Sequence, residues 1–437
     1  MMLALYLLAM SCASAAPLSL KDSVRFALDH SPGFDSAKKT QLVRELERRN
    51  SIAKILPSLD LSTTNGLQNN IPISSTNATL LTPNPAAPWY SSFNLGLTEN
   101  LYDNGISLTG IDVANLNRDL AAIGLLKSRD SLTLDIVTEF YRLSLASMLL
   151  EVKRQQEAVL EKQFKTLSSE YTQGFKTRSD YLRLKAQVQR AEIDRISTEN
   201  SLDLATTELR RLMGSEPSAT TVTFEPLHVD PAKVDQVSFP ETPPLFENLY
   251  DYKITKIQED INGKNVSLVK RNYWPQASVS SGVAYSNQNY LNSSTAFSAG
   301  HQLSWNALLL LQYNIWDWGT RKRNVEISEY NQDIQEDTLN QGLYDLHSKT
   351  ASLMSNLQRI KRNYQLNQEL LVLEEKSNRD LESQYREGKV TYLDLITELN
   401  SLLDAKIQFY TAHFEALTTL AQYRFYEGTI YESIFEK

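Results

Sequence analysis

Two short motifs hold the residues whose types and spacing are best suited to chemistry. One runs from Tyr171 through Gly174 and Thr177 to Asp180, and the other from Tyr385 through Gly388 and Thr391 to Asp394. Both follow the pattern Y-x-x-G-x-x-T-x-x-D. A threonine followed three residues later by an acid caps a helix, because the two side chains accept hydrogen bonds from otherwise unpaired backbone N–H groups. Capping alone therefore explains both aspartates.

The sequence gives little support for catalysis. The histidines at positions 30, 228, 301, 347 and 413 are scattered, without the spacing of metal ligands. The sequence contains no nucleophile elbow, phosphate-binding loop or dinucleotide fingerprint. We therefore expect no enzyme activity, no cofactor and no bound metal.

A second pair of motifs marks switches from strand to helix. The first switch, Leu101–Gly105, follows an alternation of apolar and polar residues and precedes a long segment without proline. The second, Ile315–Gly319, repeats it 214 positions later, which is the distance in the chain from Asp103 to Asp317. Either Asp103 or Asn104 caps the helix that follows. The chain is thus built as two copies of one design.

Each copy contains a long arm of the same length. From Gly105 to Gly174, and again from Gly319 to Gly388, the chain advances 69 residues. Helices of that length extend about 100 Å, whereas ordinary globular helices have about 8–20 residues. Gly174 and Gly388 sit where a left-handed residue ends a helix. Two helical segments of equal length indicate that both span the same fixed distance.

The composition excludes several classes of protein. A formal charge of -8 argues against nucleic-acid binding, which needs a basic face. No apolar run of about 18 residues follows the leader, so no transmembrane helix is expected. Residues 1–16 resemble a secretory leader that ends in an A-x-A cleavage site. Cys12 is the only cysteine, and its poor lipobox makes lipidation there the lesser alternative.

Two β-hairpins precede the switches, over residues 57–102 and 275–316. Each has strands of about 10 residues, which is the length of transmembrane β-strands, and long polar loops over 69–89 and 287–300. Apolar residues at alternate positions from Leu303 to Ile315 share one face, with Trp305, Tyr313 and Trp316 towards its ends; Leu308 and Leu310 are exceptions on the otherwise polar face. A soluble hairpin packed on a core is the alternative. The leader, the aromatic residues at the strand ends and the polar loops favour hairpins that span a membrane over a soluble hairpin.

A membrane sheet of this kind requires several protomers. Two hairpins supply four strands, too few to close a barrel, and a bilayer tolerates no open sheet edge. Several protomers must therefore share one barrel, which predicts a ring-shaped oligomer in contact with lipid.

The repeat also divides the chain. We expect a signal peptide over 1–16, a first repeat over 17–214, a linker over 215–244, a second repeat over 245–427 and a tail over 428–437. Long helices are expected over 105–173 and 319–387, with return helices over 177–213 and 391–427. The return helices are about half as long, so the helices before each hairpin are expected to stack on them end to end.

With these residues and spacings the chain resembles the TolC family of outer-membrane efflux channels. The resemblance covers nearly the whole mature chain. It implies an α+β membrane protein, a homotrimer with one outer-membrane β-barrel of four strands per protomer, continued by a long antiparallel α-helical barrel in the periplasm. It also implies a passive exit duct for efflux or type I secretion. Its partners would be a periplasmic adaptor (membrane fusion) protein and an inner-membrane pump of RND, ABC or MFS type.

The resemblance assigns roles to the turn residues. The turns around Gly174 and Gly388, with Thr177 and Thr391, would form the periplasmic tip that meets the adaptor. Tyr385 matches the family's latch tyrosine and Asp180 its carboxylate partner. Asp394 matches a carboxylate at the narrow end of the pore, where three copies would form a cation-favouring ring.

Two family residues are missing from the expected positions. The latch arginine would fall at Val390, and a second pore carboxylate would fall at Thr397. The latch is therefore weaker or built differently, and Arg178 or Lys389 could substitute for the arginine.

Two other kinds of protein fit part of the pattern. Ile136, Phe140 and Leu143 step by four and three residues, as a coiled-coil seam does, so a structural or adhesive coiled-coil protein of the cell surface is the main alternative. The adaptor itself is the other, but an adaptor would show one helical hairpin between halves of a β-domain.

Overall fold

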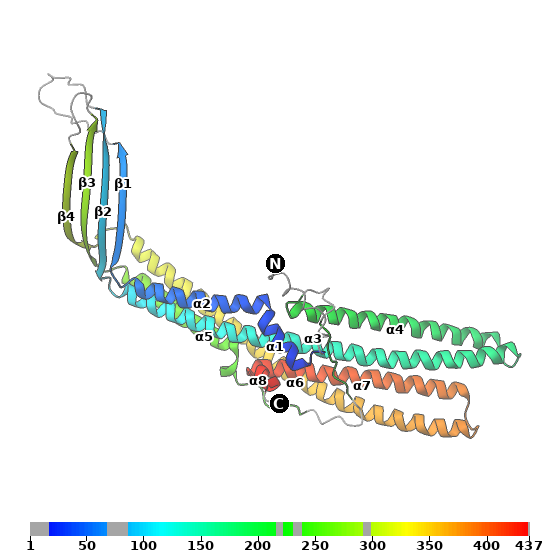
Figure 1. Cartoon of the computed structure of the whole chain (residues 1–437). Coiled ribbons are helices and arrows are strands. Elements are labelled where there is room, and N and C mark those ends of the chain that lie inside the picture. The colour runs from blue at the N-terminus through cyan, green and yellow to red at the C-terminus, as the bar shows by residue number, and fades with distance from the viewer. Residues whose placement is uncertain (1–16, 68–85, 216–221, 230–237, 292–298, 436–437) are drawn as a thin grey trace, which may run out of the picture. The chain divides into compact units, whose positions relative to one another are not determined.

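The computed structural model describes residues 17–67, 86–215, 222–229, 238–291 and 299–435. The elements (Figure 1) are α1 (Leu20–His30), α2 (Pro32–Ala53), β1 (Ser58–Leu67), β2 (Ala86–Tyr102), α3 (Ile106–Thr172), α4 (Arg178–Leu212), the 3-10 helix η1 (Phe246–Asn248), α5 (Tyr250–Arg271), β3 (Gln276–Leu291), β4 (Ala299–Gln312), α6 (Thr320–Arg386), α7 (Tyr392–Glu427) and α8 (Ile430–Phe435). The predicted leader and the lipidation alternative at Cys12 lie outside the described residues.

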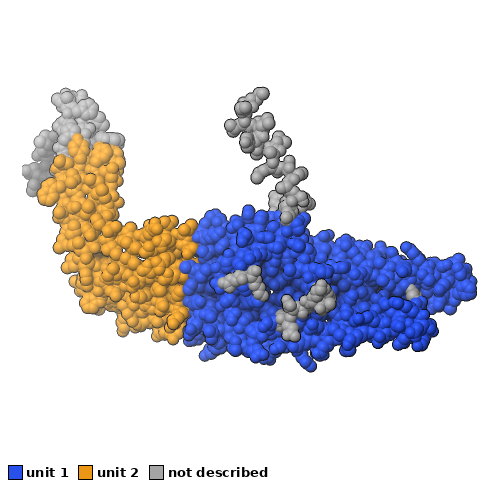
Figure 2. Space-filling view, turned by 60° about the horizontal axis from the view of Figure 1, so that its bottom comes forward, with its two compact units in different colours: residues 1–40, 122–255, 340–437 blue, residues 41–121, 256–339 orange. Residues whose placement is uncertain are grey.

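The chain forms two compact units, coloured separately in Figure 2. Unit 1 comprises residues 1–40, 122–255 and 340–437, and unit 2 comprises residues 41–121 and 256–339. Each unit takes segments from both sequence repeats. The compact units therefore do not follow the boundary between the repeats.

Unit 2 contains one antiparallel sheet with the strand order β1-β2-β3-β4. Its register places Leu61 opposite Leu95, Leu95 opposite Val283, and Val283 opposite Trp305. Residues directly opposite one another in an antiparallel pair point to the same side of the sheet. These four apolar residues, one from each strand, therefore lie in one row across the sheet.

The apolar row is part of a whole apolar face. Leu59, Leu97, Leu309 and Leu311 stand at alternate positions on the same strands and face the same side, since side chains in a strand alternate. Leu61 is 76% exposed and Trp305 is 80% exposed. On the described residues, nothing in unit 2 covers this face. The opposite face carries mainly small and polar residues such as Asn94, Ala284 and Ser304.

The hairpin strands are longer than the sequence predicted. Residues 86–89 and 287–291 belong to β2 and β3, although the polar and proline-rich composition predicted loops there. Pairing between β2 and β3 overrides composition, and Pro88 falls at a register shift between Ala86 and Trp89, where a proline is tolerated. Residues 299–300 of the second predicted loop belong to β4, and residues 69–85 and 292–298 lie outside the described residues.

Unit 1 contains most of two helical hairpins. Helices α3 and α6 both have 67 residues, and α4 and α7 have 35 and 36. The first residues of α3 and α6, 106–121 and 320–339, belong to unit 2. Leu160 of α3 packs on Leu184 and Ala191 of α4, and Met148 of α3 packs with residues of α6 and α7 such as Phe409. Ile136, Phe140 and Leu143, the predicted seam, are buried in another core cluster.

Linker and terminal residues pack on the same unit. The backbone of Leu18 pairs with Thr223 and Glu225 of the linker. Tyr250, at the start of α5, donates a hydrogen bond of 2.6 Å to Asp130 of α3, a fully buried aspartate. Ile430 of α8 lies in the core beside α3. Among the described residues, no helix is long and apolar enough to cross a membrane.

Candidate functional site: the helical turns and the strand–helix switches

The two helical turns have the same backbone construction. After α3, the N–H of Gly174 donates to Tyr171 at 3.0 Å and the N–H of Phe175 donates to Glu170 at 2.9 Å. After α6, Gly388 donates to Tyr385 at 3.0 Å and Lys389 to Gln384 at 2.9 Å. This pattern, which satisfies the last carbonyl groups of a helix, requires a left-handed residue.

Gly174 and Gly388 supply that residue. Their φ angles are 84° and 73°, as the sequence predicted. A Cβ atom built on either glycine would meet nothing within 4 Å. The need for glycine therefore comes from the backbone angle alone, and the space beside both glycines is free in the described chain.

Thr177 and Thr391 cap the helices that follow. The N–H of Asp180 donates to the hydroxyl of Thr177 at 3.2 Å, and the N–H of Asp394 donates to that of Thr391 at 3.3 Å. Each threonine hydroxyl also donates to the aspartate carboxylate, at 2.7 and 2.6 Å. Thr391 adds a backbone N–H bond of 3.0 Å to Asp394, which completes a capping box. The predicted capping role is confirmed for both.

These bonds set the charge of the two carboxyl groups. Hydrogen bonding from the Thr177 hydroxyl lowers the pKa of Asp180, with a smaller contribution from the Thr177 backbone N–H. The Thr391 hydroxyl, followed by the Thr391 N–H, lowers the pKa of Asp394. Both aspartates are therefore negatively charged near the tips of the helical hairpins at neutral pH.

Tyr385 lies in the last turn of α6 and is 40% exposed. Its counterpart Tyr171 is stacked on Tyr181 of α4, with 5.0 Å between ring centroids, and Phe164 lies 5.3 Å from the same ring. Position 395, which corresponds to Tyr181, is a leucine. The cluster of Tyr171, Tyr181 and Phe164 thus fastens the first hairpin. The sequence pattern did not predict this cluster, although the three aromatic residues stand in it at spacings of 7 and 10 residues.

The surfaces of the two turns differ in chemistry. Phe175 is 76% exposed just after Gly174. Lys389 occupies the corresponding place after Gly388 and pairs with Glu387 at 2.5 Å. Arg178 is the first residue of α4. Val390 and Thr397 occupy the positions where the resemblance places an arginine and a carboxylate.

The strand–helix switches are also built alike. The carboxylate of Asp103 accepts from the N–H groups of Gly105 at 3.0 Å and Ser107 at 2.7 Å. Asp317 accepts from Gly319 at 3.1 Å and Arg321 at 3.0 Å. Of the two capping candidates in the first switch, the structure selects Asp103. The side chain of Asn104 instead donates to the carbonyl of Arg271.

Each switch contains two consecutive left-handed residues. Asn104 and Trp318 both have a φ angle of 57°, followed by Gly105 at 77° and Gly319 at 79°. Asparagine adopts this conformation more readily than most residues, whereas it is uncommon for a tryptophan. The shared aspartate and glycine, rather than the type of the residue between them, therefore determine the switch.

No metal centre accompanies these sites: the described residues contain no group of three or more His, Cys, Asp or Glu side chains able to hold an ion.

Comparison with known proteins identifies the chain. The model of the family described as outer membrane efflux protein matches residues 25–215 and 255–429. The chain belongs to this outer membrane efflux protein family. The sequence-based resemblance is thereby confirmed, and the protein is an outer-membrane protein of an efflux family.

Solved structures share the fold. The CmeC outer membrane channel of Campylobacter jejuni matches with a TM-score of 0.80 at 12% identity, over 94% of this chain and 86% of that one. VceC of Vibrio cholerae matches with a TM-score of 0.73 at 16% identity, over 94% and 96%. The open state of the MtrE channel of Neisseria gonorrhoeae matches with a TM-score of 0.69 at 16% identity, over 95% and 88%. No curated protein sequence matches the chain.

Proposed function

We propose that this efflux family member is the outer-membrane exit duct of a tripartite efflux or type I secretion system. Three copies share one β-barrel, four strands from each, and their long helices continue it as a tunnel in the periplasm. The duct is passive. A periplasmic adaptor protein opens it, and an inner-membrane pump supplies the energy.

The sheet is the observation that carries this proposal. Among the described residues, β1 and β4 each pair on one side only, so the sheet has two open edges. One face is apolar across all four strands and exposed, from Leu61 on β1 to Trp305 on β4. Such a sheet suits lipid only if its edges are closed. Pairing of β4 with β1 of the next copy closes them.

Exposed apolar residues on the helices support an oligomer. Leu42 and Leu46 of α2 are 62% and 56% exposed, and Ile193 and Leu204 of α4 are 65% and 59% exposed. Monomeric proteins seldom leave contiguous apolar surface uncovered. We assign these surfaces to contacts between neighbouring copies in the helical tunnel.

The two turns are the proposed docking and gating region. Each turn follows a helix of 67 residues, α3 or α6. We assign adaptor contact to Gly174–Ser179 and Gly388–Leu393. Tyr385 and Asp180 form the proposed latch, and Asp394 lines the narrow end of the pore.

Mass and conductance test the proposal together. We expect detergent-extracted protein to have the mass of a trimer, because one chain cannot close its strands, and to conduct ions when inserted into planar bilayers. A stable monomer embedded in the membrane, or a trimer that inserts without conducting, would refute the duct.

A further inference from the structure

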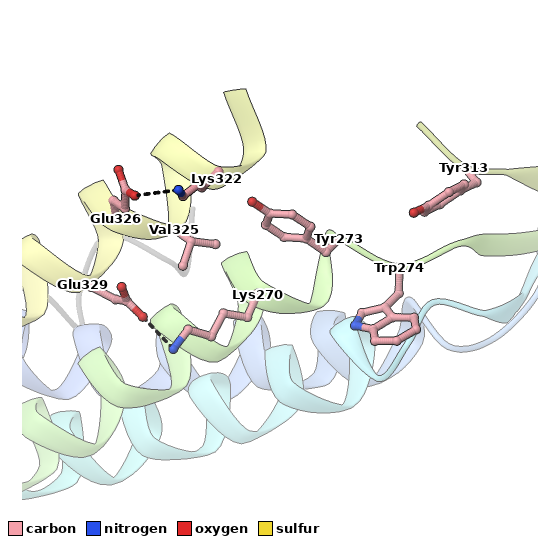
Figure 3. A pocket seen from close by; sticks show the side chains of 8 residues that line it. All are labelled: Lys270, Tyr273, Trp274, Tyr313, Lys322, Val325, Glu326 and Glu329. Carbon is pink, nitrogen blue, oxygen red and sulfur yellow. Dashed lines mark ion pairs between the residues drawn. The ribbon is translucent and has the colours of Figure 1, made fainter. Parts of the chain in front are cut away.

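A pocket of about 530 Å³ lies in unit 2 where the second hairpin meets the helices. Its walls come from the end of α5, the start of α6 and the residues that flank β3 and β4 (Figure 3). It is lined by Lys270, Tyr273, Trp274, Tyr313, Lys322, Val325, Glu326 and Glu329. Its volume falls within the range of small-molecule sites, about 300–1,000 Å³.

The charges in this pocket balance. Lys270 lies 2.7 Å from Glu329, and Lys322 lies 3.9 Å from Glu326. The Lys322 side chain is 79% exposed and its pair is long, so its ammonium group is free to turn toward a ligand. Two ammonium groups and two carboxylates are best matched by a ligand that itself carries one negative and one positive group.

The side chain of Arg321 holds in place the aromatic side of the pocket, formed by Tyr273 and Tyr313. Its guanidinium lies over the rings of Tyr273 and Tyr313, at 5.2 and 5.7 Å from their centroids. It also binds Asp317 at 2.8 Å and the Tyr273 carbonyl at 3.4 Å. The strand–helix switch thus holds the pocket in shape. Because Arg321 already occupies these two rings, they are less available to a second cation.

The first switch provides an internal comparison. Positions 107, 108 and 115 correspond to 321, 322 and 329, and they are Ser107, Leu108 and Asn115. The first switch has the same left-handed pair and the same aspartate cap without these charges. The fold of the switch therefore does not require Arg321, Lys322 or Glu329, and the charges of the second switch call for another explanation.

The pocket adjoins the apolar face of the sheet. Leu309 and Leu311 belong to the apolar face, and Tyr313, which lines the pocket, follows β4 two residues after Leu311. Leu309 and Leu311 are 71% and 69% exposed, and Trp274 is 62% exposed. A ligand in the pocket would have apolar surface directly beside it, along which a hydrocarbon chain can lie.

We propose that this pocket binds the head group of a zwitterionic aminophospholipid such as phosphatidylethanolamine. The phosphate accepts hydrogen bonds from Lys270 and Lys322, and the primary ammonium donates to Glu326 and Glu329. The acyl chains follow the row of Leu309 and Leu311. This inference rests on the proposed barrel, which places that row in lipid.

The same chemistry discriminates against other lipids. A phosphatidylcholine head group has no N–H to donate to the carboxylates, and Arg321 already covers the two tyrosine rings that would attract its quaternary ammonium. A phosphatidylglycerol head group has no positive group for Glu326 and Glu329. The pocket should therefore prefer the primary amine.

The test measures lipid retained by the purified full-length protein. The protein is equilibrated in vesicles with equal amounts of phosphatidylethanolamine, phosphatidylcholine and phosphatidylglycerol of the same acyl chains, re-extracted, and analysed by mass spectrometry. Conductance and trimer mass are measured on the same samples. We expect phosphatidylethanolamine to be retained about tenfold over the others, as charge-assisted hydrogen bonds warrant.

Two variants and a matched control make the test specific. Lys270→Ala with Lys322→Ala should remove retained phosphatidylethanolamine. Glu326→Gln with Glu329→Gln should keep lipid bound but lose the preference over phosphatidylcholine. Lys264→Ala is the control, because Lys264 forms a comparably exposed pair of 2.7 Å with Asp112 outside this pocket. It should bind lipid as the wild type does.

The possible outcomes distinguish failure of the proposed lipid site from failure of the proposed duct function. Unchanged lipid in the double lysine variant, or an unchanged preference in the double glutamate variant, overturns the lipid site while normal conductance leaves the duct intact. Loss of the trimer in the lysine variant would instead assign the pocket to a neighbouring copy and also overturn the site. Absence of conductance in the wild type refutes the duct itself.

Discussion

Thr391 donates two hydrogen bonds to the carboxylate of Asp394, one from its hydroxyl and one from its backbone N–H. Thr177 makes the hydroxyl bond to Asp180. Such bonds favour the ionised carboxylate and lower its pKa. A group with a lowered pKa in the folded state stabilises the fold above its unfolded pKa and loses that contribution as the pH falls through the folded value.

We therefore predict that the first turns of α4 and α7 loosen in acid. Backbone hydrogen exchange there, relative to the intrinsic rate, should rise as the pH falls below about 4, near the pKa of an unfolded aspartate. Asp394→Asn should remove this dependence in α7 and leave it in α4. Asp203→Asn, within α4, is the control and should change neither. A pH-independent exchange rate in both wild-type turns would contradict the prediction.

At the scale of elements, the turns and switches are fixed by backbone angles. Each long helix starts after a left-handed pair and ends at a left-handed glycine, so its length is set at both ends. The equal lengths of α3 and α6 follow from this. Because no atom lies near the missing Cβ of either turn glycine, a larger residue there costs backbone strain and leaves packing intact.

We predict that Gly174→Val combined with Gly388→Val abolishes export while trimer yield stays nearly unchanged. A left-handed conformation costs a non-glycine residue roughly 1–2 kcal/mol, so the turns should change shape locally. Export of a pump substrate and trimer mass are the measurements. Gly342→Ala, in the middle of α6 with open space beside it, should preserve both. Normal export by the valine variant would remove these turns as the docking site.

The elements that local signals specify could be predicted from the sequence. The aspartates, glycines and alternating residues place the switches, turns and hairpins within a few residues of their observed bounds. The ends of β2 and β3 could not be predicted, because pairing of Ala86 with Leu291, 205 residues later in the chain, overrides a loop-like composition. The Arg321 contacts and the Tyr171–Tyr181 stack also depend on which side chains meet in space.

At the scale of the whole molecule, the proposed trimer repeats each contact between hairpins three times around the pore, and the three contacts together would act as a gate. Capping already accounts for Asp180, so the gating role rests on whether Tyr385 binds it across neighbouring hairpins. A hydrogen bond to a charged group contributes about 1.5–3 kcal/mol. Three such bonds in one ring would shift the balance between closed and open states substantially. The absence of an arginine at Val390 leaves the proposed closed state with fewer contacts.

We therefore predict that Tyr385→Phe raises single-channel conductance or open time in planar bilayers. The substitution removes only the hydroxyl group, and the Tyr385 carbonyl that accepts from Gly388 is untouched. Tyr171→Phe is the matched control, because Tyr171 holds the same place in the other turn and packs through its ring. It should behave as the wild type. In the same recordings, Asp394→Ala should weaken block by multivalent cations, because a ring of three carboxylates is lost. Tyr385→Phe channels with wild-type conductance and open time would leave these residues with capping and turn formation alone.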